Sequence, residues 1–235
     1  MIIKNVVILA GGEGKRMRDL LGSTPKVLAS VNGVPFIHLL LDRWKNTGIE
    51  NIHLLLGYKS NEIWNECIEW HSKSDNSKVK LSASIEPYPL GDGGALLTAK
   101  PFLNAPFFFT YGDVYPTVDI QALSDTFSDE FDICMSVCPQ DIAMERGNVE
   151  LFNDTIICYD KAEQSKKYVE VGLMIIRPSI LKSLELGFRT VAEILKESIS
   201  NGKVKAYLHY MPSKHIGDPV AYNEFIEWYN DNITD

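Results

Sequence analysis

The stretch that decides the fold is "NVVILAGGEGKRM", residues 5–17, in which an apolar run meets three glycines and a basic pair. The apolar part predicts a strand buried on both faces, because polar residues do not alternate along it. Gly11, Gly12 and Gly14 allow backbone N–H groups to turn inward without Cβ clashes. Arg16 offers a forked donor for phosphate oxygens. The stretch therefore predicts a strand that ends in a phosphate-binding loop.

Strand and helix patterns alternate outward from this stretch. Apolar runs predict strands over 5–11, 51–58, 79–86 and 106–114, and helical spacing predicts helices over 35–48, 60–73 and 93–103. Gly48 is the expected C-cap of the first helix and Ser60 the expected N-cap of the second. This order predicts parallel strands covered by helices on both faces.

The second half of the chain is richer in strands. They are predicted over 131–139, 147–152, 155–161, 169–178 and 206–211, with helices over 190–202 and 218–231. Thr190 is the expected N-cap and Gly202 the expected end of the first of these helices. We find no repeat or linker in the sequence. The economical interpretation is a single α/β domain over 1–235.

Composition narrows the class of protein. Hydrophobic residues make up 45% of the chain and charged residues 23%, as in ordinary globular proteins. The net charge of -8 argues against nucleic-acid binding through a basic face. No apolar run approaches the roughly 20 residues that span a bilayer, and the first residues lack a signal-peptide pattern. Four cysteines without regular spacing predict reduced thiols in a cytoplasmic protein.

The glycine loop does not follow the common nucleotide motifs. No Gly-Lys-Ser/Thr is present, so the loop is not a Walker sequence. "GGEGKR" lacks the third glycine of the dinucleotide fingerprint, and no acidic residue closes the second strand. A NAD-dependent enzyme is therefore disfavoured.

"LAGGEGKRM" (9–17) followed by "TPK" (24–26) resembles the signature of the nucleoside-diphosphate-sugar pyrophosphorylases, which are sugar-phosphate nucleotidyltransferases. Further segments agree with this family in order and spacing: "EPYPLGDGGALLTAK" (86–100), "FFFTYGDVYPTVDIQAL" (107–123), "CYDKAE" (158–163), "VEVGLMII" (169–176) and "HIGDPVAYNEF" (215–225). The subgroup that it resembles most is the short heptose-1-phosphate guanylyltransferase type. The resemblance implies a Rossmann-like mixed sheet flanked by helices, without a C-terminal β-helix. It also implies a nucleotide-binding half over 1–125 and an acceptor-binding half over 126–235.

The family reaction joins an NTP to a phosphorylated acceptor and releases pyrophosphate. The acceptor phosphate attacks the α-phosphorus directly, so the protein has to position two polyanions and neutralise their charge. By resemblance, Arg16 holds the leaving phosphates, Lys26 stabilises charge at the α-phosphoryl, Asp113 holds Mg²⁺ and Lys161 anchors the acceptor phosphate. The implied nucleotide-binding residues are Leu9, Ala10, Gly11, Gly12, Gly14, Glu86, Gly91 and Gly93, and the implied acceptor-binding residues are Gly147, Lys161 and Glu170.

Glu86 and the backbone of 91–94 are the candidates for selecting the base. A carboxylate can accept from two donors of guanine or from the N4 amine of cytosine, whereas uracil and thymine offer one N–H. This chemistry favours GTP, with CTP next. The expected partners are thus an NTP and a small phosphorylated acceptor, with no nucleic acid and no membrane, in a homodimer that supplies surface or capsule polysaccharide precursors.

Besides Asp92, which stands where the family usually has threonine, two departures from the family pattern bear on the chemistry. His215 stands where the family has its second metal carboxylate, and Asp218 lies three residues later. Because Mg²⁺ rarely selects imidazole, either Asp218 replaces that carboxylate, or Asp113 acts with phosphates and water, or Mn²⁺ is preferred. Glu170 stands where the family has an asparagine that contacts sugar hydroxyls. A carboxylate there also suits a phosphorylated amine or amino acid, in a CTP-dependent reaction.

Two other classes remain as alternatives. A non-catalytic nucleotide-binding homologue is disfavoured because Arg16, Lys26 and Asp113 are all present. A glycosyltransferase of a related fold would usually carry Asp-x-Asp after the fourth strand, and "GDVY" (112–115) has a single aspartate.

Overall fold

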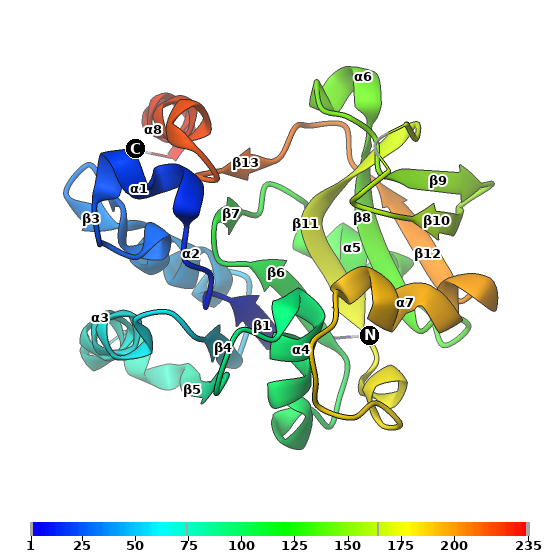
Figure 1. Ribbon diagram of the computed structural model, residues 1–235, viewed down its shortest axis with the longest axis horizontal. Coiled ribbons are helices and arrows are strands. Elements are labelled where there is room, and N and C mark those ends of the chain that lie inside the picture. Colours follow the sequence, from blue (N-terminus) through cyan, green and yellow to red (C-terminus); the bar gives the residue numbers. More distant parts are fainter. Residues whose placement is uncertain (1, 74, 164, 234–235) are drawn as a thin grey trace.

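One nine-stranded sheet runs through the part of the chain that this computed structural model describes, residues 2–73, 75–163 and 165–233 (Figure 1). In spatial order its strands are β5 (Lys80–Ile85), β4 (Asn51–Leu56), β1 (Asn5–Leu9), β6 (Phe107–Tyr111), β11 (Tyr168–Ile176), β8 (Ile133–Pro139), β12 (Val204–Leu208), β10 (Thr155–Tyr159) and β9 (Val149–Phe152). The sheet continues from the first half of the chain into the second where β6 pairs with β11.

The predicted parallel order is confirmed for the first half of the chain. β5, β4, β1 and β6 are parallel neighbours. The second half is mixed, because β11 runs antiparallel to both β6 and β8, whereas β12 is parallel to β8. The α/β class with a mixed sheet and flanking helices is thus the class predicted from the sequence.

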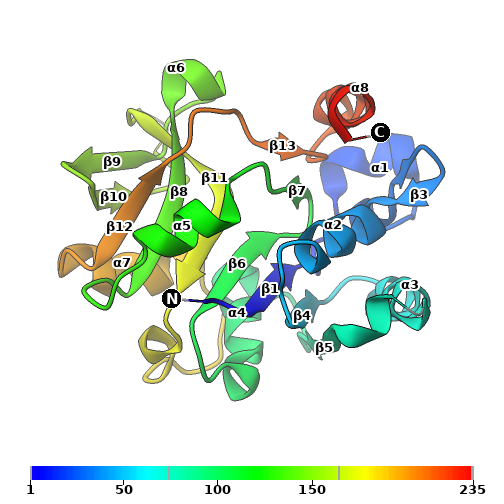
Figure 2. The ribbon, with the colours of Figure 1, turned by 180° about the vertical axis from the view of Figure 1, so that it is seen from behind.

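Helices cover both faces of this sheet. They are α1 (Arg18–Leu21), α2 (Phe36–Lys45), α3 (Ser60–Ser72), α4 (Gly91–Thr98), α5 (Ile120–Thr126), α6 (Gln140–Ala143), α7 (Val191–Ser200) and α8 (Pro219–Ile233), with 3-10 turns at 15–17, 26–28, 76–78, 100–102 and 178–181. α4 and α7 lie in front of the sheet in Figure 1, and α2 and α5 lie in front in the opposite view of Figure 2. Two short ladders, β2 (Ser30–Val31) with β3 (Val34–Pro35) and β7 (Val114–Tyr115) with β13 (Lys214–His215), complete the described elements.

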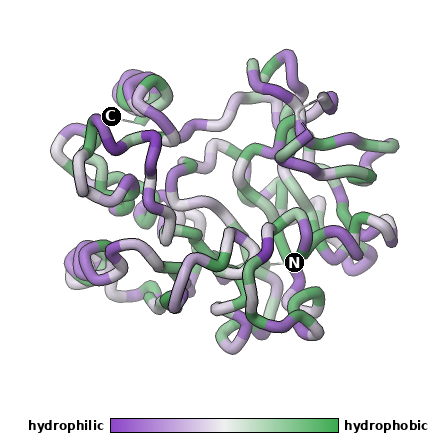
Figure 3. Tube along the Cα trace, viewed as in Figure 1, coloured by the Kyte–Doolittle hydropathy of each residue, from purple (hydrophilic) through white to green (hydrophobic). Residues whose placement is uncertain are grey.

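The core consists of two apolar layers, one on each face of the sheet. In β1, Val6 and Ile8 pack into the layer beneath α2 and α3, whereas Val7 packs into the layer beneath α4 and α7. This is the period-2 geometry of a strand buried on both faces. Figure 3 shows the apolar residues concentrated along the strands of the sheet. The apolar run in the sequence is therefore uninterrupted because both faces of β1 are buried.

Several predicted boundaries are corrected. Ser60 is not the N-cap of α3; Lys59 takes that position, with a φ of 50° and no side-chain cap. α2 ends at Lys45, three residues before Gly48. The strand expected over 106–114 ends at Tyr111, and a turn separates it from β7.

Other predicted features are confirmed. Thr190 caps α7 in a capping box with Glu193, and Gly202 has the positive φ expected after a helix end. Cys134 and Cys138 lie buried in β8, and burial raises the pKa of the Cys134 thiol to about 12. Among the described helices, none combines the length and apolarity that crossing a bilayer requires.

The carboxyl ends of β1 and β6 set the position of the candidate site. The Gly112 N–H, in the turn after β6, donates to the Leu9 carbonyl at the end of β1 over 2.7 Å. Asp113 therefore lies beside the loop that follows β1, although more than 100 residues separate it from that loop's first glycines. Ligand sites of open α/β sheets form at this edge of the strands.

Candidate active site

The loop after β1 forms one wall of a cavity of about 410 Å³. Its lining residues are Glu13, Gly14, Lys15, Arg16, Lys26 and Gly217. Gly14 has a φ of +61°, and a Cβ there would lie 2.9 Å from the Lys26 Cβ. Glycine at this position therefore allows the loop and Lys26 to pack together, which gathers three cations around one anion. This charge balance suits bound phosphates.

Lys26 and Asp113 form an ion pair between their Nζ and Oδ2 atoms. Their side chains are 16% and 22% exposed, so the pair is partly shielded from water. Two residues that the sequence analysis assigned to the reaction are thus in contact. The pair also means that Lys26 neutralises the Asp113 carboxylate when no substrate is bound.

Arg16 lies at the same edge with its side chain 73% exposed. Its NH1 atom lies 3.9 Å from Oδ2 of Asp218, just before α8. The C-terminal segment thus closes the far side of the phosphate loop. Such an exposed pair contributes little to stability, which leaves Arg16 free to turn toward an anion.

The metal-binding prediction rests on Asp113, Asp218 and His215, which line one cleft. Over the described ranges, no group of three or more His, Cys, Asp or Glu side chains is arranged to hold a metal. Asp218 is partly committed, since its Oδ1 accepts from the N–H groups of Val220 and Ala221 over 3.1 Å each. Mg²⁺ usually takes one or two carboxylates together with substrate phosphates, and this donor set fits that pattern.

A second cavity of about 450 Å³ adjoins the glycine loop. Of the predicted nucleotide-binding residues, it is lined by Leu9, Gly11, Gly12, Glu86 and Gly91. The Oε2 atom of Glu86 accepts from the Leu90 N–H over 2.9 Å, which holds the segment that leads into α4. A Cβ on Gly57 would collide with the other carboxylate oxygen, so glycine there makes room for Glu86. The Glu86 carboxylate therefore lines one end of the cavity, and the glycine loop lines the other.

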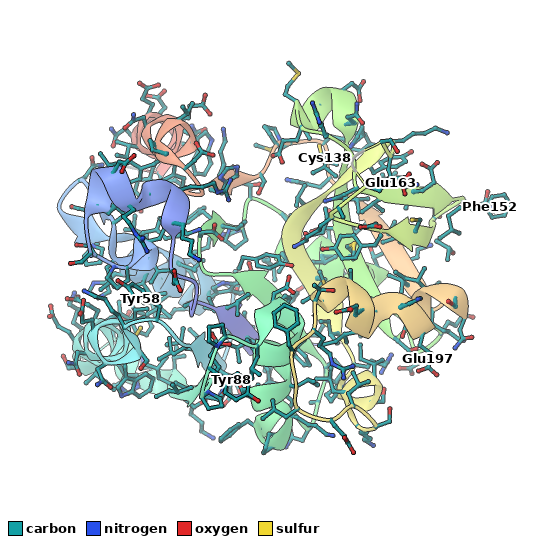
Figure 4. The ribbon with its side chains drawn as sticks, viewed as in Figure 1. Tyr58, Tyr88, Cys138, Phe152, Glu163 and Glu197 are labelled. Atoms are coloured by element: carbon teal, nitrogen blue, oxygen red, sulfur yellow. The ribbon has the colours of Figure 1, made fainter. Side chains whose placement is uncertain are left out.

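Sequence reasoning did not assign to the site several residues that line this cavity, among them two tyrosines and one aspartate. Tyr58 and Tyr88, labelled in Figure 4, contribute aromatic surface, and Tyr88 is 62% exposed. Asp92 also lines it. An exposed tyrosine within the "EPYP" segment was a signal that could have pointed to a stacking surface for a base.

Three predicted nucleotide-binding residues lie outside this lining: Gly14, which lines the first cavity, Ala10 and Gly93. Ala10 is 3% exposed and belongs to the core. The N–H groups of Gly93 and Gly94 both donate to the Arg189 carbonyl over 3.0 Å, so the loop before α7 satisfies them. Within the 91–94 segment proposed to select the base, Gly91 and Asp92 line the cavity, whereas the N–H groups of Gly93 and Gly94 are bonded within the protein.

The acceptor prediction points to a larger cleft of about 890 Å³. It lies between α6, β11, β13 and α8, and the predicted residues Lys161 and Glu170 line it together with Arg16 and Asp113. Gly147 does not line this cleft. It is buried, and a Cβ there would collide with the Lys166 carbonyl, so its role is close backbone packing.

Glu170 is a buried carboxylate with partners in the protein. Its side chain is 4% exposed, and its oxygens accept from the Gly172 N–H over 2.7 Å and the Tyr159 hydroxyl over 3.3 Å. The Lys161 Nζ lies 3.7 Å from Glu170 and donates to the Tyr111 hydroxyl over 2.7 Å. A buried carboxylate is costly without such partners.

The tyrosines of this cluster stay neutral. Burial raises the pKa of Tyr111 well above its usual value, and the charges of Glu170 and Asp92 raise it further. Burial and the charge of Glu170 also raise the pKa of Tyr159 well above its usual value. Both hydroxyls can therefore donate and accept hydrogen bonds without adding charge to the cleft. Their site role was not visible in the sequence.

Comparison with known proteins shows which proteins this chain resembles. A family model described as Nucleotidyl transferase matches residues 5–207. The chain is 26% identical over 223 residues to the D-glycero-alpha-D-manno-heptose 1-phosphate guanylyltransferase of Campylobacter jejuni, covering 94% of this chain and 97% of that protein. It is 24% identical over 224 residues to the probable glucose-1-phosphate cytidylyltransferase of Bacillus subtilis, covering 87% of each.

The fold is also that of solved structures. Crystal structures of HddC from Yersinia pseudotuberculosis, one of them complexed with GMP-PN, match with a TM-score of 0.81 at 25% identity. Each match covers 97% of this chain and 100% of the HddC chain. The family match ends before His215 and Asp218, so it says nothing about those two positions.

Proposed function

Because the chain belongs to the nucleotidyl transferase family, we propose that it transfers a nucleoside monophosphate from an NTP to a sugar 1-phosphate, such as a heptose 1-phosphate, and releases pyrophosphate. The observation that carries this proposal is the convergence of Arg16, Lys26 and Asp113 beside the cleft that contains Lys161. The guanylyltransferase and cytidylyltransferase names of the relatives support the reaction class.

The side chains have distinct tasks in this reaction. The glycine loop and Arg16 bind the β- and γ-phosphates, which leave as pyrophosphate. Lys26 exchanges its contact with Asp113 for the α-phosphoryl oxygens, where charge develops as the acceptor attacks. Lys161 binds the acceptor phosphate and brings its oxygen in line with the α-phosphorus. No protein nucleophile and no covalent enzyme intermediate is required.

A divalent metal completes the proposed site. Asp113 would hold it, with Asp218 or His215 as the second candidate, and the bound ion would neutralise phosphate charge. Mg²⁺ fits the carboxylate and phosphate donors, whereas a contribution from His215 would favour Mn²⁺. The release of Asp113 from Lys26 is the step that the protein itself must supply.

The nucleotide that we propose is GTP, with CTP next. Glu86 has one carboxylate oxygen bound to the Leu90 N–H and presents the other to the cavity lined by Gly57 and Gly91. That second oxygen can accept from guanine N–H groups or from the cytosine amine. Tyr58 and Tyr88 add surface on which a base can stack.

A panel of NTPs against candidate sugar phosphates tests this proposal, with pyrophosphate release as the readout. We expect GTP to give the highest kcat/KM, CTP to follow, and UTP and dTTP to be poor. Glu86→Gln should narrow these differences, because an amide can donate as well as accept. Strong wild-type preference for UTP or dTTP would contradict the assigned role of Glu86.

A second acceptor class is favoured by one observation, the carboxylate of Glu170 in the acceptor cleft. It suits the ammonium of a phosphorylated amine or amino acid as well as the hydroxyls of a sugar. The contacts with Gly172, Tyr159 and Lys161 already compensate its burial, so the sugar remains our leading proposal.

Glu170→Gln separates the two acceptor classes. With a sugar phosphate, the amide still forms hydrogen bonds, and kcat/KM for the acceptor should fall about tenfold or less. With a cationic acceptor, a charge-assisted contact is lost, and the fall should be about 100-fold. A variant that is heat-labile but indifferent to every acceptor would show that Glu170 serves the scaffold.

The proposal extends to the cellular setting. We propose a cytoplasmic homodimer that supplies activated sugars for surface polysaccharides. Support for the reduced compartment comes from the free cysteines, of which Cys67, Cys134 and Cys138 are buried. Sedimentation measurements of the purified protein test the dimer.

A further inference from the structure

Asp92 stands where the nucleotide cavity meets the acceptor cleft. It lies in the first turn of α4 and lines the nucleotide cavity, with its side chain 22% exposed. Its Oδ1 atom accepts two backbone hydrogen bonds, from the Gly93 N–H over 2.9 Å and from the Val191 N–H over 2.8 Å. The Val191 bond ties the first turn of α4 to the first turn of α7, and the two bonds together fix the orientation of the carboxylate.

The second oxygen of Asp92 faces Lys161. The Oδ2 atom lies 3.8 Å from the Lys161 Nζ, and Oε2 of Glu170 lies 3.7 Å from the same nitrogen. The nitrogen also donates to the Tyr111 hydroxyl and lies 4.2 Å from the centre of that ring. Lys161 is therefore held between one carboxylate from α4 and another from β11, with an aromatic hydroxyl as its hydrogen-bond acceptor.

The flexibility of lysine makes this arrangement consequential. Lys161 is 44% exposed on a four-carbon side chain, and a single partly exposed ion pair holds such a side chain weakly. Two carboxylates that are each anchored by backbone N–H groups define one position for the ammonium. Gly172 anchors Glu170, and Gly93 with Val191 anchors Asp92.

We propose that Asp92 is a positioning residue that holds Lys161 for the acceptor phosphate and links that lysine to the nucleotide-binding segment. This inference rests on the proposed function, in which Lys161 binds the acceptor. Asp92 itself acts through Lys161 and does not contact the reacting atoms. Asp92 is only two residues from the end of the 86–90 segment, so its carboxylate connects Lys161 to the wall of the nucleotide cavity.

Asp92→Asn isolates the charge from the helix contacts. The amide oxygen can still accept from Gly93 and Val191, so the thermal midpoint should change little. Asp92→Ala removes those two contacts as well and should lower it. Asp154→Asn is the matched control. Asp154 also forms an ion pair with a lysine, since its Oδ2 atom lies 3.3 Å from the Lys205 Nζ, and this pair lies outside the cleft.

The first readout is the acylation rate of individual lysines by an N-hydroxysuccinimide ester, followed by peptide mass spectrometry. Asp92→Asn should raise labelling of Lys161 about threefold, the size expected of one partly exposed ion pair, and leave Lys205 unchanged. Asp154→Asn should show the reverse. Unchanged Lys161 labelling in Asp92→Asn would overturn the proposal. This readout requires no turnover, so it stands apart from any failure of the proposed function.

The second readout is kinetic. Asp92→Asn should lower kcat/KM for the acceptor about tenfold, while KM for the NTP stays within about twofold. In a Lys161→Met background the same change should cost less than about twofold, because its target is gone. A loss that persists in that background, or one that falls on the NTP alone, contradicts action through Lys161.

Discussion

Asp113→Ala should lower turnover by about 1,000-fold or more, with pyrophosphate release as the measurement. The carboxylate is the best-placed metal ligand of the proposed site, and loss of a ligand from an ion at the transition state removes several kcal/mol of stabilisation. Burial of the Lys26–Asp113 pair is incomplete, so the fold should survive the change.

Asp154→Ala is the control for Asp113→Ala, since it removes an equal side chain from an exposed position that lies away from the cleft. The control should retain wild-type turnover. If Asp113→Ala keeps near-normal turnover that still depends on a divalent metal, Asp113 is not the metal ligand.

Lys26→Ala should remove roughly 2–4 kcal/mol of transition-state stabilisation, as expected for a charged donor aimed at developing charge. This loss lowers kcat/KM about 30- to 1,000-fold. The structure also predicts that the same variant binds a divalent metal more tightly. Because Lys26 neutralises Asp113 in the free protein, its removal should tighten the binding of Mn²⁺ in the absence of nucleotide. Metal titration of the free variant measures this effect.

Lys205→Ala serves as the control for Lys26→Ala, because Lys205 pairs with an aspartate that lies outside the site. It should change neither turnover nor metal binding. Weaker turnover of Lys26→Ala together with unchanged Mn²⁺ affinity would show that the ion pair does not compete with the metal.

Local patterns were sufficient to predict most of the elements. The uninterrupted apolar runs predicted buried strands because both faces of this sheet are covered by helices. Thr190 with Glu193 specified the start of α7 through bonds within one helical turn. The start of α3 could not be predicted from such a local pattern. Lys59 takes a left-handed backbone conformation there, and a lysine side chain gives no sequence signal for that conformation.

The glycine loop, Arg16 and Lys26 were predicted from sequence because backbone N–H groups and cations suit phosphates, whereas the role of Asp113 was implied by the family resemblance. Ala10 and Gly93 were assigned to the nucleotide by their place in the motif, and the structure adds that Ala10 is buried and that the Gly93 N–H bonds to the loop before α7. A motif specifies residue types, whereas packing decides which backbone groups remain available.

By itself, the sequence determined the fold class and predicted the phosphate loop and the cations that we propose for the reaction, because these depend on short-range patterns and on charge. The tertiary structure alone decided which of these charges meet. The Lys26–Asp113 pair and the cluster of Asp92, Lys161 and Glu170 join residues that lie far apart in the chain. Their energies depend on distance and burial, and both quantities arise only when the strands align their carboxyl ends at one edge of the sheet.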